Sequence, residues 1–254
     1  MLQAHSFLWH YGWIAPNILT LILAACIWRR SVQKLYPVFF GYLIFASLEG
    51  ICLYVLDLAP AVSPRAWWYA FWAGTIIEGV WKFLVVAELL HHLFHSWPSV
   101  AKLGRNLVSG AGALLVLLAS VAAAFAAPDN APQYIGGAHI LAQTLYLAEA
   151  GVVVSIFVLA AYFRIPWERT SFGIALGACI IWCAHLAVWA LIAGGVVRNR
   201  DWVDIAKMAA YHLGVLIWFY YVIIPQKTVA KSAVPLPENN LDVWNRELER
   251  LLQQ

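Results

Sequence analysis

The sequence has very little charge. Only 11% of its 254 residues are Asp, Glu, Lys or Arg, whereas 63% are apolar, and soluble domains carry roughly a quarter charged residues. It also lacks the basic, aromatic-rich pattern that predicts binding to nucleic acid. These shortages exclude an ordinary soluble domain and a nucleic-acid partner. They indicate a protein whose main surroundings are the lipid bilayer.

Motifs for catalysis and for cross-linking are missing as well. There is no Gly-rich phosphate loop, no Gly-x-Ser-x-Gly and no His-Glu-x-x-His. The four cysteines form no Cys-x-x-Cys pair and all lie in apolar stretches, at Cys26, Cys52, Cys179 and Cys183. We therefore expect buried thiols rather than disulfides or a redox site, and a protein that is not an enzyme. The first residues lack the basic charge of a cleavable signal peptide, so we expect the first apolar stretch to be retained.

Long apolar stretches are what the sequence has in abundance. A transmembrane helix needs about 20 predominantly apolar residues, and seven stretches meet this need: 10–28, 36–58, 67–94, 105–127, 139–163, 171–196 and 203–225. The loops between them, such as 128–137 and 198–201, are too short to hold a separate domain. The sequence therefore predicts an all-α fold in which residues 1–225 form one seven-transmembrane-helix bundle.

The distribution of Lys and Arg predicts how this bundle is oriented. With the N-terminus outside, eleven Lys and Arg residues fall in the inner loops and tail, and only Arg65, Arg198 and Arg200 fall in the outer loops. Positive charge accumulates on the cytoplasmic side of membrane proteins. We therefore expect an N-out, C-in protein of a bacterial inner (cytoplasmic) membrane.

The C-terminal tail has a different pattern. Residues 226–239 are rich in proline and polar side chains, which predicts an extended linker. Residues 240–254 predict a short amphipathic cytoplasmic helix, capped by Asn240. Its polar face is net acidic, which favours docking on protein over anionic lipid. The apolar face expected to meet a protein partner consists of Leu241, Trp244, Leu248 and Leu251.

Several ionisable residues interrupt the apolar stretches at similar depth. Groups of this kind are costly in lipid, so they are expected to face the interior of a bundle and to pair with one another. Glu78 and Lys82 are four residues apart with the acid first, the favourable order for a pair on one helix. Either a functional site or structural pairing between helices would account for the set. The predicted intramembrane polar core is Glu49, Glu78, Lys82, Glu149, His185 and His212.

Two smaller patterns suggest a metal or a haem group. Glu88, His91 and His95 recur every three or four residues, so one helix face would present a carboxylate and two imidazoles to a transition metal. His185 and His212 lie mid-helix on successive spans, as the two axial ligands of a haem would. The alternative for the first pattern is that the histidines are solvated. The alternative for the second is that His185 and His212 are hydrogen-bonded residues of the core. No cofactor is predicted from the rest of the sequence.

The stretch Trp182-Cys-Ala-His-Leu-Ala-Val-Trp189 resembles the Trp-x-Ala-Tyr-x-x-x-Trp stretch of helix six in microbial rhodopsins. Helix number, length and orientation are also similar to that family. The resemblance implies aromatic walls around a retinal. A rhodopsin needs a Schiff-base lysine in the middle of helix seven, where this chain has Tyr211 to Leu216, with Lys207 nearer the helix start. Retinal is therefore not expected.

Two function classes follow from these observations. The first is a non-enzymatic integral membrane protein, either a sensor or receptor or an accessory subunit of a larger membrane complex. The second is a bundle that translocates protons or ions through the mid-membrane acids and bases. No internal repeat with broken helices, common in transporters, is visible, which favours the first class. A haem- or metal-binding membrane redox protein is a third, weaker alternative.

Overall fold

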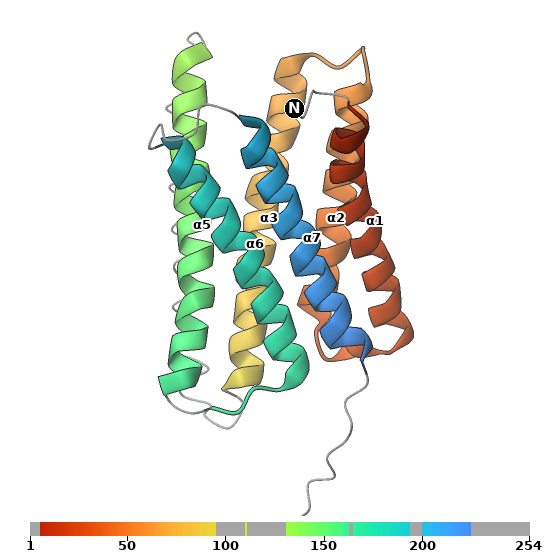
Figure 1. Ribbon diagram of the computed structural model, residues 1–254, viewed down its shortest axis with the longest axis vertical. Helices are drawn as coiled ribbons and strands as arrows, with labels where there is room; N and C mark the ends of the chain where they lie inside the picture. Colours follow the sequence, from red (N-terminus) through yellow and green to blue (C-terminus); the bar gives the residue numbers. More distant parts are fainter. Residues whose placement is uncertain (1–5, 95–109, 111–130, 163–164, 194–199, 225–254) are drawn as a thin grey trace, which may run out of the picture. The chain divides into compact units, whose positions relative to one another are not determined.

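The computed structural model describes residues 6–94, 110, 131–162, 165–193 and 200–224. The chain divides into two units, 1–223 and 224–254, and the first is described below. Its described residues form six α-helices, one short 3₁₀ helix and no strand (Figure 1). The elements are α1 Phe7–Arg29, η1 Val32–Lys34, α2 Pro37–Leu58, α3 Pro64–Leu93, α5 Ala131–Tyr162, α6 Arg169–Ala193 and α7 Arg200–Ile223.

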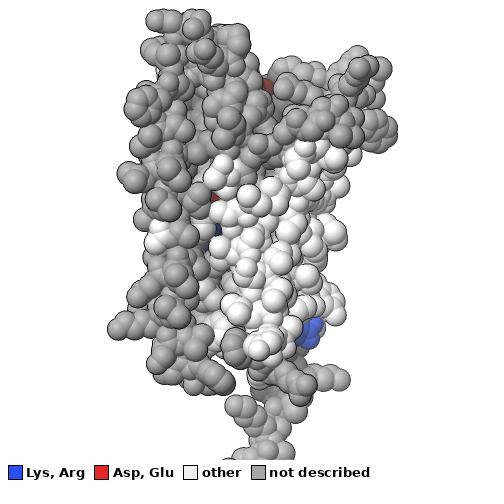
Figure 2. Space-filling view, turned by 90° about the vertical axis from the view of Figure 1, so that its left-hand side faces the viewer, with Lys and Arg blue, Asp and Glu red and all other residues white. Residues whose placement is uncertain are grey.

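Five of these helices, α1, α2, α5, α6 and α7, are long and apolar enough to cross a membrane. The helix α3, with 30 residues, is not among them, and it carries Glu78, Lys82 and Glu88. Large apolar side chains such as Ile22, Leu147 and Val158 are exposed. Figure 2 shows one face whose described surface carries almost no charged residue. An exposed surface of this kind suits contact with a lipid bilayer.

The six helices pack as a closed ring. Contacts join α1 to α2, α2 to α3, α3 to α5, α5 to α6, α6 to α7, and α7 back to α1. The Arg30 guanidinium, just beyond α1, helps to close this ring because it donates to the carbonyl oxygens of Val222 and Ile223. These carbonyls belong to the last turn of α7, where the helix itself supplies no donor.

The packing of α6 against α7 depends on three glycines. A methyl group at Gly177 would lie 2.9 Å from the Gly214 carbonyl oxygen, which is a backbone atom, and would also overlap the Trp218 ring. Gly173 likewise faces the Tyr221 side chain. The spacing of Gly173 and Gly177 is the small-residue pattern that allows membrane helices to approach closely. Trp218 fills the space and donates to the Ile174 carbonyl oxygen at 3.1 Å.

The apolar core lies toward the end of the bundle where α1 and α7 terminate. Leu23, Ile27, Phe39, Leu89 and Trp218 are all almost completely buried there. Toward the opposite end the residues between the helices become polar, and a cavity takes the place of the core. The polar residues Glu49, Glu78 and Lys82 line this cavity.

Two of the predicted loops are shorter than expected. α5 begins at Ala131, so most of the predicted loop 128–137 is helical, and α7 begins at Arg200, inside the predicted loop 198–201. Pro132 accounts for the first difference, because proline is accommodated in the first turn of a helix. The N–H groups of that turn have no acceptor within the helix, so the absence of an N–H in proline breaks no helical hydrogen bond. The predicted span 105–127 and the tail, with Leu241, Trp244, Leu248 and Leu251, lie outside the described residues.

Candidate ligand-binding cavity

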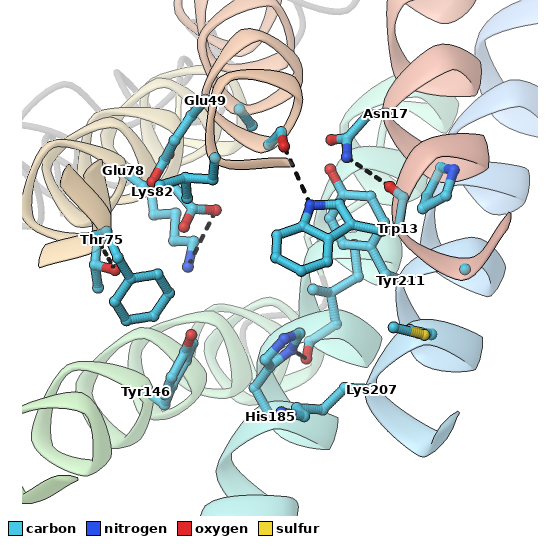
Figure 3. A pocket seen from close by; sticks show the side chains of 18 residues that line it. Trp13, Asn17, Glu49, Thr75, Glu78, Lys82, Tyr146, His185, Lys207 and Tyr211 are labelled. Carbon is cyan, nitrogen blue, oxygen red and sulfur yellow. Dashed lines mark hydrogen bonds and ion pairs between the residues drawn. The ribbon is translucent and has the colours of Figure 1, made fainter. Parts of the chain in front are cut away.

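A cavity of about 340 Å³ lies between the helices (Figure 3). It is in the size range of small-molecule sites, at its lower end. Every one of the six α-helices contributes to its wall. The polar and aromatic residues that line it are Trp13, Asn17, Glu49, Phe71, Thr75, Glu78, Lys82, Tyr146, His185, Lys207 and Tyr211.

Lys82 is the centre of the buried charge at this cavity. Its ammonium lies 3.5 Å from Glu78 on the same helix and 3.2 Å from Glu149 on α5. Lys82 is 5% exposed and Glu149 is 2% exposed. The ammonium also lies 5.1 Å from the centre of the Tyr146 ring. Buried charges persist only when they are paired in this way, so the three charged groups hold α3 and α5 together.

Glu49 adds a third carboxyl group from α2. Its side chain lies against Gly74 of α3, where the addition of a methyl group would collide with the carboxyl. Within the described part of the chain it makes no hydrogen bond or ion pair, in contrast to Glu78, which also accepts a hydrogen bond from Tyr42 at 3.4 Å. Glu49 is therefore an acid of the cavity wall whose two carboxyl oxygens both have unused hydrogen-bonding capacity.

The wall contributed by α1 is held by hydrogen bonds to the backbone. The Trp13 indole donates to the Gly50 carbonyl oxygen at 3.1 Å, and the Asn17 amide donates to the Trp13 carbonyl oxygen at 2.7 Å. Asn17 lies directly over Gly50, which has no side chain to obstruct it. The Trp13 ring therefore has a fixed position in the cavity wall (Figure 3).

His185 forms part of the opposite wall. Its Nδ1 donates to the Ile181 carbonyl oxygen at 2.8 Å, and its ring stacks on Tyr146 with 5.2 Å between ring centres. In a neutral imidazole with this bond, Nε2 is an acceptor. Lys207 of α7 also lines the cavity, and Figure 3 places it beside His185 and away from Glu49.

His212, the other predicted haem ligand, has a different environment. Its Nδ1 donates to the Met208 carbonyl oxygen at 2.8 Å, and its ring stacks on Tyr11 of α1 with 5.9 Å between ring centres. His185 stacks on α5 instead. The two imidazoles thus pack against helices on different sides of α6 and α7, and His212 is not among the residues that line the cavity.

Glu88, from the predicted metal set, contacts the start of α2. Its two carboxylate oxygens accept the backbone N–H groups of Val38 and Phe39, each at 2.9 Å. These donors have no partner within their own helix, so Glu88 acts as a cap supplied by a neighbouring helix. His91 is exposed, and His95 lies outside the described residues. Among the described residues, no group of three His, Cys, Asp or Glu side chains could hold a metal ion.

The structure brings together Glu49, Glu78, Lys82, Glu149 and His185 of the predicted polar core. Sequence reasoning missed the residues that complete the cavity wall, above all Trp13, Tyr146 and Lys207. The sequence contained only a weak indication of Trp13 and Tyr146, because aromatic residues are common throughout the chain. Lys207 carried the clearest signal, as a cation on helix seven within an apolar stretch, but the sequence did not indicate that it lines a cavity.

Comparison with known proteins adds no family to this description: the chain matches no protein-family model, no curated protein and no solved structure.

Proposed function

We propose that this protein is a non-enzymatic, receptor-like integral membrane protein that binds a small molecule in the cavity between its helices. The observation that carries the proposal is that all six described helices line one cavity. A molecule bound there lies in a space whose wall is shared by every helix of the ring. It therefore has the means to favour one packing of the helices over another, which is the physical requirement for sensing.

A cavity-filling variant tests this proposal. Ala46 lines the cavity, so Ala46→Phe is expected to reduce the space for a ligand. The purified protein in lipid nanodiscs is screened by thermal shift against small molecules of positive, negative and zero charge. We expect compounds that stabilise the native protein and lose this effect in Ala46→Phe. The matched control is Ala25→Phe, because Ala25 is exposed on the same bundle. A screen in which no compound stabilises the protein would count against a binding function.

Proton translocation is a second candidate, and the excess of carboxyl groups around Lys82 favours it. Two carboxyl groups, Glu78 and Glu149, pair with this ammonium group, and a third, Glu49, lines the same cavity. Intramembrane sets of this kind occur in proton relays. Reconstituted liposomes with a trapped pH-sensitive dye test this alternative. Proton flux that is abolished by Glu78→Gln would support it, and equal flux in protein-containing and empty liposomes would exclude it.

The proposed topology has seven spans, with the N-terminus outside and the C-terminus in the cytoplasm. The Lys and Arg distribution supports this orientation, and the apolar stretch 105–127 supplies the additional span. Reporter fusions at both termini are expected to place residues 1–12 outside and 226–254 inside. Both termini on one side, or the reverse pattern, would refute the topology. Residues 240–254 are proposed to dock on protein, which also fits an accessory subunit.

A further inference from the structure

On the side of the cavity formed by α1, α2 and α3, the hydrogen-bonding capacity left over is mainly that of an acceptor. The Trp13 indole, one of the two N–H donors of Asn17 and the Thr75 hydroxyl are bonded to backbone carbonyl oxygens at 3.1, 2.7 and 2.9 Å. Glu49 forms no hydrogen bond or ion pair within the described residues, and a carboxylate accepts several. A ligand that matches this wall must therefore bring donors to the α2 side of the cavity.

The charges on the α2 and α3 side also favour a cation. Lys82 is flanked by Glu78 at 3.5 Å and Glu149 at 3.2 Å, so its charge is already engaged by two acids. Glu49 brings a further carboxyl group to the same side. Lys207 lies on the far side of the cavity (Figure 3). A cation therefore meets acidic groups on the α2 and α3 side of the cavity.

The remaining wall is aromatic. Trp13, Phe71 and Tyr146 line the cavity, and aromatic faces attract cations as well as apolar groups. The volume of about 340 Å³ holds roughly eleven water molecules at ~30 Å³ each. The cavity therefore has room for a molecule with one ring and a short chain.

On this basis, and resting on the binding function proposed above, we propose that the ligand is a small protonated amine with an apolar or aromatic body. Its ammonium group donates to the Glu49 carboxylate, and its body lies between Trp13 and Phe71. Glu49 is the residue that distinguishes an amine from a neutral molecule of the same shape.

Three probes of matched shape test this inference: phenethylamine, 2-phenylethanol and 3-phenylpropionate. Their binding to the full chain is measured by calorimetry in nanodiscs of phosphatidylcholine, a lipid without net charge. We expect phenethylamine to bind about tenfold or more tightly than the alcohol, because a hydrogen bond to a charged group has roughly that effect. The acid is expected to bind most weakly.

Glu49→Gln is expected to lower the affinity for phenethylamine to that for the alcohol. Asp57→Asn is the matched control: it makes the same charge change on the same helix at an exposed position outside the cavity, and the amine preference should remain. Retained binding of the alcohol by Glu49→Gln shows that the variant is folded.

Two results would overturn the inference. Equal binding of the amine and the alcohol by the unmodified protein would refute an amine ligand and leave the cavity as a binding site for another class. An amine preference that persists in Glu49→Gln would refute the role of Glu49. If none of the three probes binds up to its solubility limit, the amine inference fails, and the broader compound screen then decides the binding function.

Discussion

The Lys82 ammonium lies 3.2 Å from the Glu149 carboxylate, although the two residues are 67 positions apart in the chain. They belong to α3 and α5, and both side chains are almost completely buried. The pair crosses a helix interface beside the cavity, so it connects the stability of the bundle to the site.

Lys82→Leu is expected to lower the free energy of unfolding by about 3–5 kcal/mol, because it leaves Glu149 and Glu78 buried without their cation. Denaturation of the protein in detergent micelles measures this loss. The double variant Lys82→Leu/Glu149→Gln should recover part of it, since one uncompensated acid is removed. A single variant as stable as the unmodified protein would show that the ion pair does not hold α3 to α5.

Gly177→Ala is expected to destabilise the bundle by about 1–3 kcal/mol, because its methyl group would press on α7. The nearest atoms include the Gly214 carbonyl oxygen, which belongs to the backbone and cannot rotate away. Gly151→Ala on α5 is the control, as a methyl group there meets nothing within 4 Å. This control should be neutral or stabilising by up to ~1 kcal/mol, from helix propensity alone. Equal thermal stability of the two variants would contradict the proposed packing.

Glu88→Ala is expected to cost about 1–3 kcal/mol, because the N–H groups of Val38 and Phe39 lose their acceptor. His91→Ala should change stability by less than ~0.5 kcal/mol, since His91 is exposed. The same variants address the predicted metal set in a second measurement. Zinc is added to the unmodified protein and to both variants, and the bound metal is determined after dialysis. If Glu88, His91 and His95 form a metal site, the unmodified protein retains zinc and both variants retain less.

Trp244→Ala with Leu248→Ala is expected to increase cleavage of the tail by added protease. The reason is that burial of such side chains contributes about 1.5–3 kcal/mol each, and an isolated helix of fewer than about 12–15 residues is marginal in water. Glu247→Ala with Glu249→Ala, on the polar face, is the control and should leave cleavage unchanged. If the two double variants are cleaved at the same rate, the predicted helix docks on nothing.

The sequence by itself determined the class of this protein. Long apolar stretches interrupted by few charges can be stable only as membrane helices, and the described helices lie close to the predicted stretches. The predicted core residues Glu78, Lys82 and Glu149 were found from the same rule, because a charge within an apolar helix must find a partner. Helix ends were less predictable, as Pro132 illustrates, because proline is accepted both in loops and in a first helical turn.

Only the tertiary structure decided which of these groups meet and what surrounds them. The chain distance between Lys82 and Glu149 gives no information about their contact, which depends on how α3 packs against α5. The contact of Glu88 was likewise not predictable from the sequence. Its carboxylate caps α2, and this role depends on where the neighbouring helix begins and not on the spacing between Glu88 and His91. The cavity arises in the same way. Residues such as Trp13, Tyr146 and Lys207 are scattered along the chain, and the closed ring of helices turns them toward one space.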